Sequence, residues 1–206
     1  VFALEIAKYS DAWAWIKARI KAHNFAGIHV ADYIPITMNK QTMKMQVAGI
    51  DTYYRTTNLL LNHHIDFISK DCFSRSVKWT ESRSNNGNAT NNSPYMISDL
   101  HTFLTTTLYG YLPAAVKAVI SNKHALMEYR YSENSPGNLV NSTGQGWQDL
   151  GPLWVPLEYE VFGSTIWGTK GWSHGQGVQY PIFANSFLNR IKGAGNGGRR
   201  CHWWTA

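Results

Sequence analysis

Residues 153–163 read LWVPLEYEVFG and residues 198–206 read GRRCHWWTA, and the region bounded by these two motifs decides how the chain is interpreted. Twelve of the 17 glycines lie from residue 144 onward, and six of the nine tryptophans lie from Trp147 onward. No Asp or Glu follows Glu160. Five cations therefore supply all but one unit of the formal net charge of +6: Lys170, Arg190, Lys192, Arg199 and Arg200. The C-terminal quarter is basic, aromatic and rich in glycine, whereas the preceding residues are nearly neutral.

The two motifs resemble those of a domain of unknown function that is widespread in Firmicutes and their phages, in which a strand and a short helix precede a Trp–Trp strand. Residues 50–54 (IDTYY) and 63–71 (HHIDFISKD) are similar to its early strands. Residues 98–104 (SDLHTFL) and 108–120 are similar to its helical insertion. That family resembles in turn the C-type-lectin-like fold of phage receptor-binding proteins, including those varied by diversity-generating retroelements. Its last strands follow the Trp–Trp motif, so the resemblance implies a domain that is incomplete at its C-terminus.

The order of the expected elements indicates the fold class. Apolar residues make up 44% of the chain and charged residues 16%, which suits a globular protein. Helices and strands do not alternate regularly, which favours an α+β fold. We expect an N-terminal helical arm (residues 1–25) and a C-type-lectin-like domain (residues 26–206) with short antiparallel strands and a two-helix insertion. Apolar and β-branched runs predict strands over residues 28–38, 43–50, 59–69 and 124–132, and polar runs predict loops over residues 81–94 and 134–146.

Helix signals occur in two places. Residues 10–23 (SDAWAWIKARIKAH) predict a helix with Ser10 as its N-cap. Apolar residues spaced for one face of this helix are Trp13, Ile16 and Ile20. Trp15 falls off that stripe, so we expect it to be partly exposed. Ser98 is the predicted N-cap of a second helix, and a third runs over residues 113–120.

Local signals also predict a hairpin. Pro35 lacks an amide proton, which places residues 28–38 at a sheet edge or at a strand start. Residues 39–41 (NKQ) suit a turn between the first two strands. In the third strand, alternation places Ile65 and Phe67 on one face.

Candidate catalytic and metal-binding groups are few. His63, His64 and Asp66 form the densest cluster of ligand types, but on a strand only His64 and Asp66 share a face. Two ligands are too few for a zinc site, so we predict no metal and no cofactor. Glu158 and Glu160 have the chemistry of a glycosidase pair, but the resemblance places them on a short helix, where we interpret them as charges at a solvated helix start.

Two cysteines are present, Cys72 and Cys201. Cys201 precedes His202, but neighbouring strand residues diverge, so this pair does not read as a thiol with its base. Cys72 and Cys201 pair only if the fold brings them together, and we expect free thiols.

Positive charge without acidic neutralisation attracts anionic partners, and aromatic side chains among glycine loops stack on sugars or peptides. We therefore expect a non-enzymatic virion surface protein of a phage, or a prophage-encoded surface protein, that binds a host cell-surface glycan or protein. It is expected to be homo-oligomeric, to contact other virion proteins, and to lie on the phage particle or otherwise outside the cell or on its surface. The longest apolar runs are too short to span a membrane, and the scattered cations match no nucleic-acid motif.

Two alternatives remain open from the sequence: a structural virion component, such as a capsid decoration or fibre-attachment protein, and a cell-wall glycan hydrolase. Chemistry and loop context select the expected ligand contacts: Trp167, Trp172, His174, Arg199, Arg200 and Trp203.

Overall fold

The computed structural model describes residues 2–56, 62–79, 95–128, 145–164, 178–195 and 198–203. The chain divides into two compact units. The first comprises Val1–Ser74, Tyr111–Ile120 and Val178–Trp203, and the second comprises Arg75–Gly110, Ser121–Gly177 and Trp204–Ala206. Helices and two antiparallel sheets are mixed, which confirms the α+β class, while the C-type-lectin-like fold stays a prediction.

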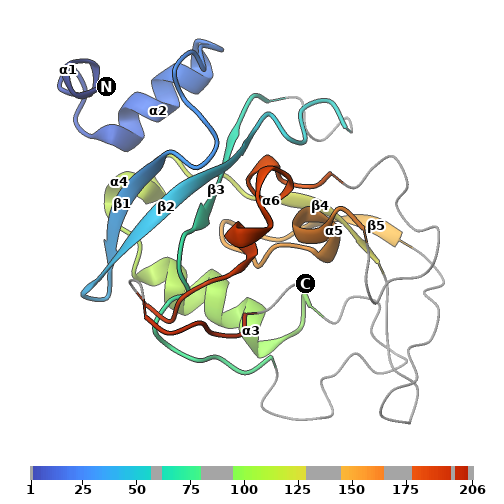
Figure 1. Cartoon of the computed structure of the whole chain (residues 1–206). Helices are drawn as coiled ribbons and strands as arrows, with labels where there is room; N and C mark the ends of the chain where they lie inside the picture. Colours follow the sequence, from blue (N-terminus) through green and yellow to red (C-terminus); the bar gives the residue numbers. More distant parts are fainter. Residues whose placement is uncertain are drawn as a thin grey trace, which may run out of the picture. The chain divides into compact units, whose positions relative to one another are not determined.

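The elements of each unit are labelled in Figure 1 where space permits. The first unit contains α1 (Ala3–Ile6), α2 (Ala12–Lys21), β1 (Tyr33–Met38), β2 (Gln41–Ile50), β3 (Ile65–Ser69), α4 (Ala114–Lys117), α6 (Pro181–Asn185) and the 3₁₀ helix η3 (Phe187–Arg190). The second contains α3 (Asp99–Thr102), the π-helix η2 (Phe103–Leu108), β4 (His124–Glu128), β5 (Gln145–Asp149) and α5 (Glu158–Phe162).

The sheet of the first unit is an antiparallel ribbon in the order β1-β2-β3 (Figure 1). Asn39 and Lys40 connect β1 to β2, and both have positive φ angles, 45° and 64°. Two residues with positive φ match the twist of a tight hairpin. Pro35 lies in β1, at the edge of the described sheet, so the predicted hairpin and edge position are confirmed.

Helix α2 packs its apolar side chains into the core of this unit. Asp11 is its N-cap, because its carboxylate accepts hydrogen bonds from the Trp13 and Ala14 amides, so the prediction of Ser10 as the cap was wrong by one residue. Trp15, expected to be partly exposed, is only 4% exposed. Its indole N–H donates to Glu5, which satisfies the polar end of a buried side chain. The core around α2 contains Trp15, Ile16, Ile28 and Val47.

Strands β1 and β3 begin later than their apolar runs predicted, whereas β2 begins at Gln41, two residues before its predicted start at residue 43. β1 begins at Tyr33, not at residue 28, because a turn precedes it: the Asp32 amide donates to the His29 carbonyl at 3.1 Å, and Ala31 has a φ of 75°. β3 begins at Ile65, and the first residues of its predicted run lie outside the described ranges. Ile65 and Phe67 both pack against the core cluster, which confirms the predicted face.

Gly49 permits α6 to approach β2. A Cβ atom at Gly49 would collide with the Thr52 side chain and lie 3.1 Å from Pro181, the first residue of α6. β2 also has an irregular register between Val47 and Gly49. A residue without a side chain is thus required where the helix meets the strand.

In the second unit, the Ser98 hydroxyl accepts a hydrogen bond from the His101 amide, which confirms the predicted N-cap of α3. Pairing of β4 with β5 aligns Leu126 with Trp147. β5 is a correction, since its first residues were assigned to a loop. No helix in the described ranges has both the length and the apolar character needed to cross a bilayer.

Candidate functional site

The last described residues of the first unit form a small antiparallel ribbon, named here the C-terminal hairpin (residues 192–195 and 198–201). Its two arms are joined by the Ala194 amide, which donates to the Arg199 carbonyl at 2.8 Å, and by the Cys201 amide, which donates to the Lys192 carbonyl at 3.0 Å. Gly193 and Arg200 are directly opposite one another. The hairpin therefore has a defined backbone, although its sequence is dominated by glycine.

The first arm of the hairpin is attached to the segment that follows β3. The Cys72 amide donates to the Gly193 carbonyl at 2.9 Å, and the Gly195 amide donates to the Cys72 carbonyl at 3.1 Å. The Asp71 carboxylate accepts a third hydrogen bond, from the Gly193 amide at 3.1 Å. These bonds hold the C-terminal hairpin beside residues distant in sequence, and nothing in the spacing of the motifs predicted them.

The buried side chain of Lys192 connects the start of the C-terminal hairpin to the end of β3. Its side chain is 4% exposed, its ammonium donates to the Ser69 carbonyl at 2.8 Å, and it lies 5.7 Å from the centre of the Phe183 ring. Burial lowers the pKa of Lys192 to about 8, and the nearby Cys72 and Asp71 oppose that shift only partly. Lys192 therefore stabilises the fold and is not exposed to a ligand, although it belongs to the basic C-terminal quarter of the sequence.

The structure describes three of the six predicted contact residues. Arg199 and Arg200 are exposed on the second arm of the hairpin, and neither forms an ion pair with any described residue. Trp203 is half-buried: its indole N–H donates to the Arg190 carbonyl at 2.9 Å, and its ring stacks on Phe183 at 6.2 Å. The remaining predicted contacts lie outside the described residues: Trp167, Trp172 and His174.

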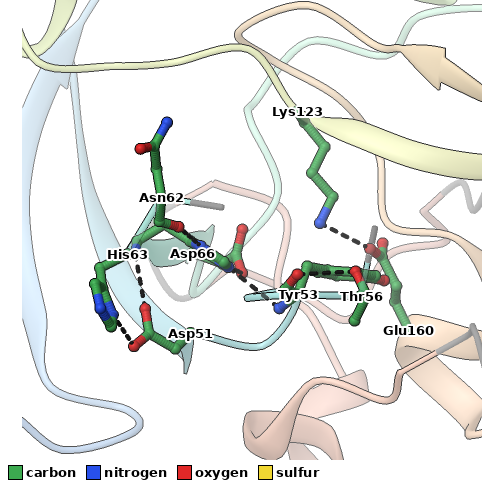
Figure 2. Close-up of polar contacts among 9 residues, drawn as sticks. Asp51, Tyr53, Thr56, Asn62, His63, Asp66, Lys123 and Glu160 are labelled. Carbon is green, nitrogen blue, oxygen red and sulfur yellow. Dashed lines mark hydrogen bonds and ion pairs between the residues drawn. The ribbon is translucent and has the colours of Figure 1, made fainter. Parts of the chain in front are cut away.

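A second cluster surrounds His63 in the same unit, and Figure 2 shows its ring directed at Asp51. His63 Nδ1 lies 2.6 Å from the Asp51 carboxylate. The centre of the His63 ring lies 3.9 Å from the centre of the His23 ring and 4.1 Å from the centre of the Tyr54 ring. A carboxylate that fixes an imidazole is a common catalytic arrangement, but here two aromatic rings also pack against the imidazole.

The backbone of this cluster is unusual, because His23, Asp51 and Arg55 all have φ angles in the left-handed region, between 51° and 60°. Asp and His tolerate that conformation better than most residues. His64 and Asp66, which were predicted to share a strand face, have side chains 3.6 Å apart. The closer pair of His63 with Asp51 was not predicted. Among the described residues, no group of three or more His, Cys, Asp or Glu side chains is arranged to hold a metal ion.

The second unit contains a buried ion pair, also drawn in Figure 2. The Glu160 carboxylate lies 3.3 Å from the Lys123 ammonium and accepts the Leu157 amide at 2.8 Å, so it closes the first turn of α5. Glu160 has no exposed surface. The short helix is where the resemblance placed it, but the interpretation of Glu160 as a solvated charge was wrong, because its partner Lys123 is distant in sequence. Glu158 is half-buried on the same helix.

The fold also brings the two cysteines together. Both are free thiols, and the Cys201 thiol donates to the Cys72 sulfur at 2.9 Å. Burial, reinforced by the neighbouring Cys201, raises the pKa of Cys72 to about 12.

Comparison of the chain with protein-family models, with curated proteins and with solved structures found no match in any of the three.

Proposed function

We propose that this protein is a non-enzymatic binding domain that attaches to an anionic polymer of a bacterial cell surface, as a phage or prophage-encoded adhesin would. The single observation that carries the proposal is the C-terminal hairpin, which presents Arg199 and Arg200 to solvent on an anchored backbone. The virion location comes from the sequence resemblance, and the surface chemistry comes from the hairpin.

Arginine suits such a ligand. Its planar guanidinium donates two parallel hydrogen bonds to a phosphate or carboxylate group, so each of the two arginines can bind one charge of a repeating polymer. Residues 161–206 include no Asp or Glu that could compete for these two side chains from within the same segment. Weak contacts of this kind gain strength when many copies act together, which fits a repeated virion protein.

The candidate catalytic groups favour binding over hydrolysis. Glu160 has no exposed surface and is engaged by Lys123 and by the Leu157 amide. A buried carboxylate in that setting cannot reach a polymer substrate, which weakens the glycosidase alternative.

The structural virion component remains the second candidate, and one observation favours it. Apolar side chains are exposed on and directly after η3: Phe187 is 67% exposed, Leu188 is 58% exposed and Ile191 is 46% exposed. Exposed apolar side chains that lie together are typical of contact surfaces between proteins.

The test measures binding of the purified full chain to extracted Gram-positive wall polymer at low and at high salt. We expect saturable binding that the double variant Arg199→Ala/Arg200→Ala weakens by roughly tenfold, because each exposed ion pair contributes up to about 1 kcal/mol. The control Lys8→Ala/Lys21→Ala removes the same charge from two exposed lysines, one between α1 and α2 and the other at the end of α2, and should bind as the parent does. Equal weakening by both double variants would show that only net charge matters, and no saturable binding would leave the structural component as the better interpretation.

A further inference from the structure

The contact between Cys72 and Cys201 lies among backbone hydrogen bonds that hold both residues in place. Cys72 follows β3 and exchanges two backbone hydrogen bonds with the first arm of the C-terminal hairpin. Cys201 is in the second arm, and its amide donates to the Lys192 carbonyl. Both cysteines are half-buried, and their sulfur atoms are 2.9 Å apart although 129 residues separate them in sequence.

We propose that Cys72 and Cys201 are a site of oxidative modification and form an intrachain disulfide that staples the C-terminal hairpin to the end of β3. A disulfide needs a sulfur–sulfur distance of about 2.05 Å, so closing the bond requires a movement of less than about 1 Å. The surrounding backbone hydrogen bonds already hold both residues in place, so this movement leaves the hairpin pairing intact. The proposal does not depend on which ligand the hairpin binds.

The oxidant is a low-molecular-weight disulfide such as oxidised glutathione, acting by thiol–disulfide exchange. One cysteine, as its thiolate, attacks a sulfur of the small disulfide and releases one small thiol, which leaves a mixed disulfide on the protein. The second cysteine then attacks the protein sulfur of that mixed disulfide and releases the second small thiol. Two protein thiols and one small disulfide thus become one protein disulfide and two small thiols, which carry away both protons and both electrons.

The surroundings of Cys72 disfavour its thiolate form. Burial and the Cys201 contact keep Cys72 protonated at neutral pH, since its pKa is raised to about 12. The product is favoured in an oxidising compartment, where disulfides persist.

The experiment exposes the full-length reduced protein to graded ratios of oxidised to reduced glutathione, blocks remaining thiols with an alkylating reagent, and maps the peptides by mass spectrometry. We expect one cross-linked peptide pair joining Cys72 to Cys201, with the loss of two hydrogen atoms, in a protein that stays monomeric on a non-reducing gel. Closing a loop of this length should raise the melting temperature by on the order of 10 °C relative to the reduced form.

Two single variants act as controls. In Cys72→Ser and in Cys201→Ser, the melting temperature should no longer change when a reductant is added, and only a mixed disulfide with glutathione should form. Both thiols of the wild-type chain remaining open to alkylation after oxidation would overturn the proposal, as would a disulfide between two chains. The peptide map uses the wild-type chain, so it decides the question even where a variant folds poorly.

Discussion

Replacing Glu160 with glutamine changes one charge in the interior of the second unit and almost nothing else. The side chain keeps its shape, and its amide oxygen can still accept the Leu157 amide that caps α5. What disappears is the carboxylate 3.3 Å from the Lys123 ammonium. The substitution therefore tests the ion pair separately from the helix cap.

The expected size of the effect follows from burial. Glu160 is 0% exposed and Lys123 is 7% exposed, so water cannot replace the lost carboxylate. Removing one partner of a buried ion pair costs about 3–5 kcal/mol, because the remaining charge stays desolvated. The Trp154 ring, 5.4 Å from the Lys123 ammonium, offsets part of this through a cation–π contact. We expect Glu160→Gln to lower the unfolding free energy by about 3 kcal/mol, which corresponds to a fall in melting temperature of roughly 6–12 °C.

The assay is urea unfolding followed by circular dichroism, with Lys123→Met and the double variant completing a mutant cycle. The double variant removes both charges, so it should be more stable than the sum of the single losses predicts, by at least about 1.5 kcal/mol. Glu158→Gln, half-buried on the same helix, is the matched control and should have the smaller effect. A loss below about 1 kcal/mol for Glu160→Gln, or simple additivity of the two single variants, would refute the reasoning.

Two further predictions concern the anchors of the C-terminal hairpin. Trp203→Ala removes the stack on Phe183 and the hydrogen bond to the Arg190 carbonyl, so it should lower the unfolding free energy by about 2–3 kcal/mol. Trp203→Phe keeps an aromatic ring and should lower the unfolding free energy by about 1 kcal/mol. Equal stability of the parent and both variants in urea would contradict this prediction. Lys192 has a folded-state pKa of about 8 against an ordinary value of 10.5, so the unfolded chain binds more protons between these pH values and stability should rise with pH there. Measured in a cysteine-free background, this gain should approach about 3 kcal/mol relative to Lys192→Met, and parallel pH profiles would contradict it.

Features that depend only on residues close together in the chain could be predicted from the sequence. The turn requires positive φ angles at Asn39 and Lys40 themselves, and the Ser98 cap requires only the amide of the residue three positions later. The edge position of Pro35 follows from its missing amide proton. Each of these signals is complete within a few residues, so the rest of the fold was not needed to interpret it.

Features that depend on a distant partner could not be predicted. Trp15 is buried because Glu5 accepts its indole N–H and because β2 supplies apolar neighbours, neither of which helical spacing reveals. β5 consists largely of polar and glycine residues, and it forms a strand only because β4 pairs with it. Glu160 looked solvated because two glutamates at a helix start usually are.

The candidate site combines both cases. The exposure of Arg199 and Arg200 agrees with the composition of the segment, but the reason why these side chains are held in place does not appear in the composition. A Cβ atom at Gly198 would collide with the Ala194 carbonyl, so this glycine is there to let the two arms of the hairpin approach closely. The hairpin is therefore held by its backbone, by the buried Lys192 and by the segment at Cys72. Because none of those contacts uses the guanidinium groups of Arg199 and Arg200, an anionic ligand can engage both arginines without disturbing the structure that positions them.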